Sequence, residues 1–164
     1  LNILFICFIV EQKIYNISPG YLPSFLSMIE KYSQFGGGAD DQRYIRGRYF
    51  SNVYEMYIFA FFLGLRNDQP FELTDNDNLT KFWEIKNWKP EEITHHLVMS
   101  SIAKANINLF SLQDLDEREL SVEVGKLKTT IEKYANGGLQ IISDHIDEDP
   151  DKAESDTFFI EMLS

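Results

Sequence analysis

The sequence predicts an all-α fold, a compact helical bundle with room only for a short N-terminal strand or hairpin. Three observations lead to this prediction. Apolar residues make up 44% of the 164-residue chain, which at this length supports a core without disulfides. Extended character is confined to the first 17 residues. Apolar residues recur at the helical period in four segments, near residues 23–35, 52–65, 90–105 and 114–136.

The N-terminal stretch, residues 1–10, is apolar apart from Asn2. It is shorter than the about 20 apolar residues that span a bilayer, so we expect no membrane segment. No basic leader precedes it and no small-residue cleavage site follows, which argues against a signal peptide. Its aromatic and β-branched residues favour a buried strand.

The first two helices have recognisable ends. Pro23 opens the first, which stops before the triple glycine at 36–38, a linker by composition. Asn52 is expected to cap the second helix, with Glu55 three residues later. That helix is apolar nearly all round, which predicts a central position.

The third helix begins at Pro90 and the fourth near Asp114. We therefore expect three parts: an N-terminal segment with a linker over 1–38, a helical core domain over 39–146, and an acidic tail or helix over 147–164. One shared core is predicted, formed by Phe59, Phe62, Leu63, Leu97, Ile102, Leu127 and Ile131.

Charge excludes some functions and favours others. Fifteen basic and 26 acidic residues give a net charge of −11, which repels nucleic acid and suits a basic protein partner. Residues 144–164 hold eight acids and one lysine, together with the apolar residues Phe158 and Phe159. This segment either docks on a partner or folds back on its own domain.

Arg43, Arg46 and Arg48 alternate with aromatic residues. This mixture is typical of a groove that binds single-stranded nucleic acid, and a local patch of this kind is the one route by which we expect direct contact with nucleic acid. The other interpretation is a solvated arm whose arginines pair with nearby acids such as Asp40 and Asp41.

Glu92 and His95 form Glu-x-x-His, and His96 follows directly. This spacing places two ligands on one helix face, as in di-iron carboxylate bundles, so a small metal-binding protein or enzyme is the alternative function. A second Glu-x-x-His is missing, and a solvated helix start explains the same residues. We therefore expect no cofactor and no catalytic residue. Cys7 is the single cysteine, which indicates a reducing, cytoplasmic setting.

Asn136, Gly137 and Gly138 interrupt an apolar helical pattern. Three interpretations are open: the helix ends here and another begins, the glycines admit a second backbone at close range, or the exposed amides form a binding nest.

Two blocks resemble the small Dnd-system-associated proteins, which are encoded beside bacterial DNA phosphorothioation gene clusters in the context of phage defence. The blocks are Phe59-Ala60-Phe61-Phe62-Leu63-Gly64-Leu65-Arg66-Asn67 and Tyr134-Ala135-Asn136-Gly137-Gly138-Leu139. The likeness spans about residues 43–145 and departs from the family pattern at both ends and over 79–89. It implies a non-catalytic accessory subunit of a DNA-modification or anti-phage system, and it supplies no active site.

Overall fold

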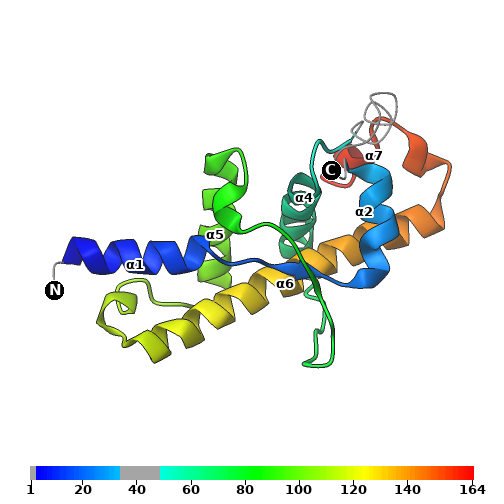
Figure 1. Ribbon diagram of the computed structural model, residues 1–164. Coiled ribbons are helices and arrows are strands. Elements are labelled where there is room, and N and C mark those ends of the chain that lie inside the picture. The colour runs from blue at the N-terminus through cyan, green and yellow to red at the C-terminus, as the bar shows by residue number, and fades with distance from the viewer. Residues whose placement is uncertain (1–2, 34–48) are drawn as a thin grey trace. The chain divides into compact units, whose positions relative to one another are not determined.

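The computed structural model describes residues 3–33 and 49–164, with side chains from Phe8 onward. Over these residues the chain is mainly helical, at 64%, with six α-helices and one small antiparallel sheet. The predicted all-α class is confirmed. The helices in Figure 1 are α1 Ile3–Tyr15, α2 Leu26–Tyr32, α4 Val53–Arg66, α5 Glu91–Lys104, α6 Glu117–Glu148 and α7 Phe158–Glu161.

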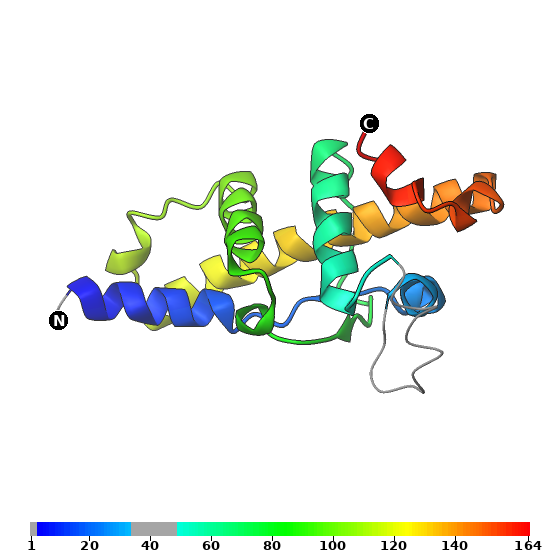
Figure 2. The same ribbon diagram turned by 90° about the horizontal axis from the view of Figure 1, so that it is seen from above.

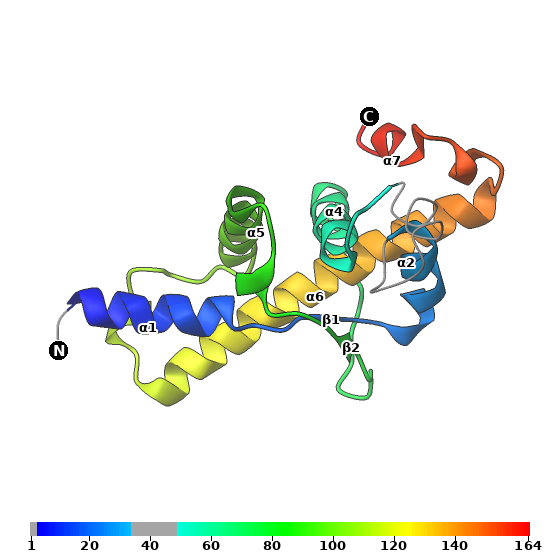
Figure 3. The ribbon, with the colours of Figure 1, turned by 45° about the horizontal axis from the view of Figure 1, so that its top comes forward.

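Strand β1 (Gly20–Tyr21) pairs with strand β2 (Thr80–Lys81), as Figure 3 shows. The chain forms two compact units. The first comprises Leu1–Gly20 and Lys81–Glu132, and the second comprises Tyr21–Thr80 and Lys133–Ser164. Helix α6 contributes its N-terminal half to the first unit and its C-terminal half to the second.

The buried strand expected over residues 1–10 is wrong, because α1 occupies Ile3–Tyr15. Strand propensity reflects packing against neighbouring strands, whereas a helix satisfies its backbone groups without a partner. Polar residues continue the helix beyond the apolar run, and Lys13 lies in its last turn, where the helix dipole favours a cation. The expectation that strands stay within the first 17 residues is also wrong, since β1 begins at Gly20.

The first unit has its own core. Leu97 and Ile102 of α5 are buried, as are Leu127 and Ile131 of α6 and Ile14 of α1. Helix α6 begins with a reciprocal capping box: the Glu119 amide donates to Asp116 Oδ1 at 2.8 Å, and the Asp116 amide donates to Glu119 Oε2 at 3.0 Å. The helix therefore starts at Glu117, slightly later than the pattern near Asp114 suggested.

The second unit is organised by the contact between α4 and the C-terminal half of α6. A Cβ atom added at Gly138 would lie 1.7 Å from the Ala60 carbonyl oxygen. One added at Gly64 would lie 2.1 Å from the Tyr134 carbonyl oxygen. Both distances are shorter than any van der Waals contact, so the two backbones meet where neither residue has a side chain. Of the three interpretations of Asn136-Gly137-Gly138, close approach of a second backbone is confirmed, and α6 continues through all three residues.

The chain that leaves α4 also packs on α6. A Cβ atom at Gly137 would lie 1.8 Å from the Gln69 carbonyl oxygen, and the Phe71 amide donates to the Lys133 carbonyl oxygen at 2.9 Å. On the same helix, the fully buried Asn136 accepts a hydrogen bond from the Leu22 amide through Oδ1 at 2.8 Å.

The C-terminal segment folds back within the second unit, so that interpretation is confirmed for Phe158 and Phe159, whereas Ile160 and Leu163 are exposed. Helix α6 continues to Glu148, and the chain then reverses into α7, as Figure 2 shows. Phe158 and Phe159 are buried. The ring centroid of Phe159 lies 5.4 Å from that of Tyr32 in α2 and 5.6 Å from that of Phe59 in α4.

The single shared core is wrong in two respects. Leu97, Ile102, Leu127 and Ile131 belong to the first unit, whereas Leu63 is buried in the second. Phe59 and Phe62 are only half-buried, and Phe61 is the fully buried phenylalanine of α4. A helix that is apolar all round gives no periodic signal to distinguish Phe61 from Phe62.

Substituting these two adjacent rings tests the orientation of α4. Phe61→Ala is expected to lower the free energy of unfolding by about 3–5 kcal/mol, because it leaves a cavity in a packed core. Phe62→Ala is the matched control and is expected to cost clearly less, since its ring is half-exposed. Urea denaturation of both variants measures the difference, and an equal or larger loss for Phe62→Ala would contradict the orientation.

Candidate functional site

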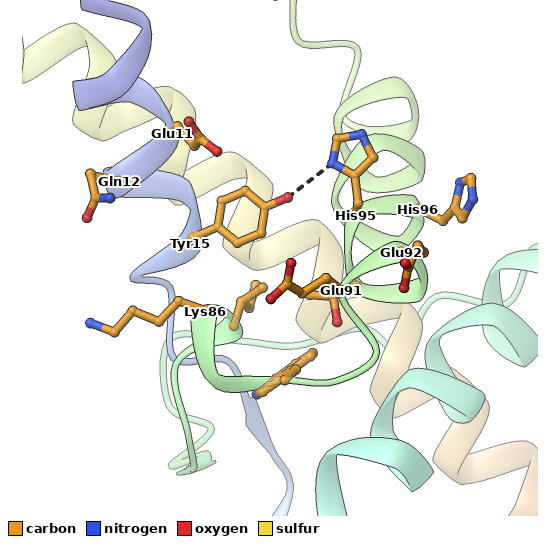
Figure 4. A pocket seen from close by; sticks show the side chains of 11 residues that line it. Glu11, Gln12, Tyr15, Lys86, Glu91, Glu92, His95 and His96 are labelled. Atoms are coloured by element: carbon orange, nitrogen blue, oxygen red, sulfur yellow. Dashed lines mark hydrogen bonds between the residues drawn. The ribbon is translucent and has the colours of Figure 1, made fainter. Parts of the chain in front are cut away.

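The candidate metal ligands lie in an open pocket of the first unit, between α1, the turn at Ile85–Asn87 and the start of α5 (Figure 4). Its volume is about 580 Å³. Polar and aromatic side chains dominate its lining, which consists of Glu11, Gln12, Tyr15, Ile85, Lys86, Trp88, Glu91, Glu92, Thr94, His95 and His96.

Local sequence places these groups. Pro90 precedes the first turn of α5, and Glu91 and Glu92 occupy that turn, where the helix dipole favours carboxylates. His95 lies one turn further on and forms a hydrogen bond between its Nδ1 and the Tyr15 hydroxyl of α1 at 3.1 Å. This bond joins α1 to α5 across the pocket.

Burial and two carboxylates act on Tyr15. Burial of the phenol raises the pKa of Tyr15, and the charges of Glu11 and Glu91 raise that pKa further. Two lysines bring positive charge near the pocket, and each has an acidic partner: Lys86 pairs with Glu84 at 2.6 Å, and Lys89 pairs with Glu91.

Glu92, His95 and His96 share the pocket but do not converge. All three are exposed, and Figure 4 shows His96 and His95 pointing in different directions. Among the described residues no group of three or more His, Cys, Asp or Glu side chains has the geometry to hold a metal ion. The Tyr15–His95 hydrogen bond is a feature of this pocket that the sequence did not predict. No local motif indicates a pair of residues this far apart in the chain.

The other candidate residues have structural positions. Asn136, Gly137 and Gly138 lie within α6 against the backbone of the second unit, and Phe158 and Phe159 lie in its core. Arg43, Arg46 and Arg48 fall outside the described residues.

Glu132 is a buried acid of the first unit. Its Oε1 accepts a hydrogen bond from the Gly20 amide at 3.0 Å and lies 3.7 Å from Lys128 Nζ. Burial raises the pKa of Glu132, while Lys128 and the Gly20 amide act in the opposite direction. One sequence signal could indicate this buried acid: Glu132 lies on the apolar side of the α6 pattern, four residues after Lys128.

The two blocks that resemble the Dnd-associated proteins meet in space. Ala60 and Gly64 come from the first block, Tyr134 and Gly138 come from the second, and their backbones touch at the crossing of α4 and α6. Comparisons with protein-family models, with curated proteins and with solved structures gave no match. Within the described parts of the chain, no helix has the length and apolar character required to cross a membrane.

The raised pKa of Glu132 predicts a pH dependence of stability. The folded state retains the proton of Glu132 to higher pH than the unfolded state, so the contribution of Glu132 to stability falls as pH rises from the ordinary pKa of 4.5 through the folded pKa. Glu132→Gln keeps an acceptor for the Gly20 amide and removes the charge. We expect the variant to gain stability relative to wild type over that interval.

Urea denaturation at pH 4 to 8 measures this difference. Glu123→Gln on the same helix, whose partner Lys126 is exposed, serves as the control and is expected to leave the contribution of Glu132 in place. A difference between wild type and Glu132→Gln that does not change with pH would contradict the assignment.

Proposed function

We propose that this protein is a non-catalytic accessory subunit of a bacterial DNA-modification or anti-phage defence system, and that it binds a basic protein partner through residues 144–164. One observation carries the binding proposal: the acidic side chains of this segment are all exposed, while its two phenylalanines are buried. The eight acids are Asp144, Asp147, Glu148, Asp149, Asp151, Glu154, Asp156 and Glu161.

A folded acidic segment differs physically from a disordered acidic tail. Phe158, Phe159 and Ala153 attach the segment to the core of the second unit, so the carboxylates are held without further loss of chain entropy on binding. Clustered charge of one sign speeds the encounter with an oppositely charged surface. Salt weakens this attraction, because screening acts beyond about 8 Å at physiological ionic strength.

The resemblance to the Dnd-associated proteins supports the biological setting. Its two blocks, Phe59–Asn67 and Tyr134–Leu139, form one packed contact in the second unit, which is a reason for them to occur together. The net charge of −11 supports a protein partner over nucleic acid as the direct ligand.

Neutralising exposed acids tests the binding proposal without disturbing the core. A variant carrying Asp147→Asn, Glu148→Gln and Asp151→Asn is expected to lose most of the partner that wild type captures from an extract of the native host. Immobilised protein, salt elution and mass spectrometry of the captured proteins measure this. The captured partner is expected to be basic and encoded near DNA-modification or defence genes.

The control changes the net charge by the same amount at other exposed acids, with Glu30→Gln, Asp75→Asn and Asp114→Asn. It is expected to capture the partner as wild type does. Equal loss in both triple variants would show that total charge matters and the segment does not. The proposal would be refuted if salt does not elute the partner and the first triple variant captures it as well as wild type does.

A further inference from the structure

An apolar groove lies beside the polar pocket in the first unit. It runs between α1, α5 and the turn at Leu112–Asp114, with a volume of about 400 Å³. Val10, Ile14, Val98, Met99 and Ile102 supply its apolar lining.

Phe110 stands at this groove and is 86% exposed, with Leu109 at 42% and Met99 at 39%. Isolated exposed apolar residues are common on protein surfaces, whereas several that line one groove mark an interaction site.

The groove and the polar pocket are neighbours. Glu11, Tyr15 and His95 line both, so α1 and α5 present an apolar groove next to a polar pocket. The pocket carries the exposed carboxylates of Glu11 and Glu92. Its other charged lining residues, Glu91 and Lys86, pair with Lys89 and Glu84. An occupant that matches this surface needs an apolar face and, beyond it, positive charge.

The chemistry of the walls also indicates the conformation of the occupant. The walls of the groove come chiefly from α1 and α5, whose internal backbone N–H and C=O groups already pair within each helix. A bound strand would find no sheet edge there to satisfy its own backbone. A bound helix satisfies its backbone internally and presents apolar side chains at i, i+3, i+4 and i+7.

We infer that the groove binds one amphipathic helix of the basic partner, with its apolar face on Phe110 and Met99 and its lysine or arginine residues at Glu11 and Glu92. This rests on the proposed function, because the occupant is taken from that partner. The carboxylates at one end disfavour an anionic membrane surface as the occupant.

A defined peptide tests the inference without the partner. The probe is a fluorescein-labelled peptide of about 16 residues, long enough for a marginal helix, with leucines at helical spacing and three lysines at one end. Its counterpart carries three glutamates in place of the lysines. Fluorescence anisotropy with the full chain is expected to show saturable binding of the lysine peptide and weaker binding of the glutamate peptide.

Two substitutions probe the two ends of the groove. Phe110→Glu is expected to lower the affinity for the lysine peptide about tenfold or more, as loss of a central anchor does. Val122→Glu replaces another exposed apolar residue of the same unit, outside the groove, and is expected to bind as wild type. Glu11→Lys is expected to lower the affinity for the lysine peptide and to raise the affinity for the glutamate peptide.

Several results would overturn the inference: no binding of either peptide, equal binding of both, or no effect of Phe110→Glu. Binding of phosphatidylglycerol vesicles that Phe110→Glu abolishes would assign the groove to a membrane. A dimer in sedimentation velocity that Phe110→Glu dissociates would assign it to a second copy of the chain. Because the probe is a peptide, these outcomes are independent of partner capture by residues 144–164, so failure of the groove and failure of the proposed function are distinguishable.

Discussion

The contact between the backbones of α4 and α6 is the constraint on which the second unit depends. Gly64 and Gly138 bring the helices so close that a single methyl group at either position would overlap a carbonyl oxygen. Helices usually pack through side chains at about 8–10 Å between axes, and contact through glycine is closer. The loss of helix stability at glycine, about 0.5–1 kcal/mol relative to alanine, is offset here by the close packing of α4 against α6.

Other segments of the second unit pack around this contact between α4 and α6. The chain after α4 passes over Gly137, and Asn136 accepts the Leu22 amide from the segment before α2. Phe159 then packs against Tyr32 and Phe59 and holds the C-terminal segment in place. The exposed acids of residues 144–164 are consequently displayed on a folded surface, which is the basis of the proposed partner binding.

The sequence predicted the helices well where the helical period and the flanking residues agreed, as for α4, α5 and the body of α6. The cap predicted at Asn52 is wrong in detail, because Asn52 precedes α4 but its side chain makes no capping hydrogen bond. Prediction failed where local signals were ambiguous. The apolar run before Glu11 has the composition of a strand, yet it forms most of α1. Phe61 and Phe62 are equivalent in an all-apolar pattern. The Tyr15–His95 bond and the groove at Phe110 join segments distant in sequence, so they depend on tertiary packing. The sequence leaves three interpretations of Asn136-Gly137-Gly138 open, and the position of Ala60 beside Gly138 decides between them.

The most direct measurement compares alanine at two glycines of the same helix. Gly125 has nothing within 4 Å of an added Cβ atom, so Gly125→Ala is expected to raise the free energy of unfolding by about 0.5–1 kcal/mol. Gly138→Ala carries the same gain in helix propensity and adds the overlap with Ala60. It is expected to lower the unfolding free energy by about 1–3 kcal/mol or more. Stabilisation of both variants in urea denaturation would show that α4 and α6 do not meet at Gly138 and would contradict the account.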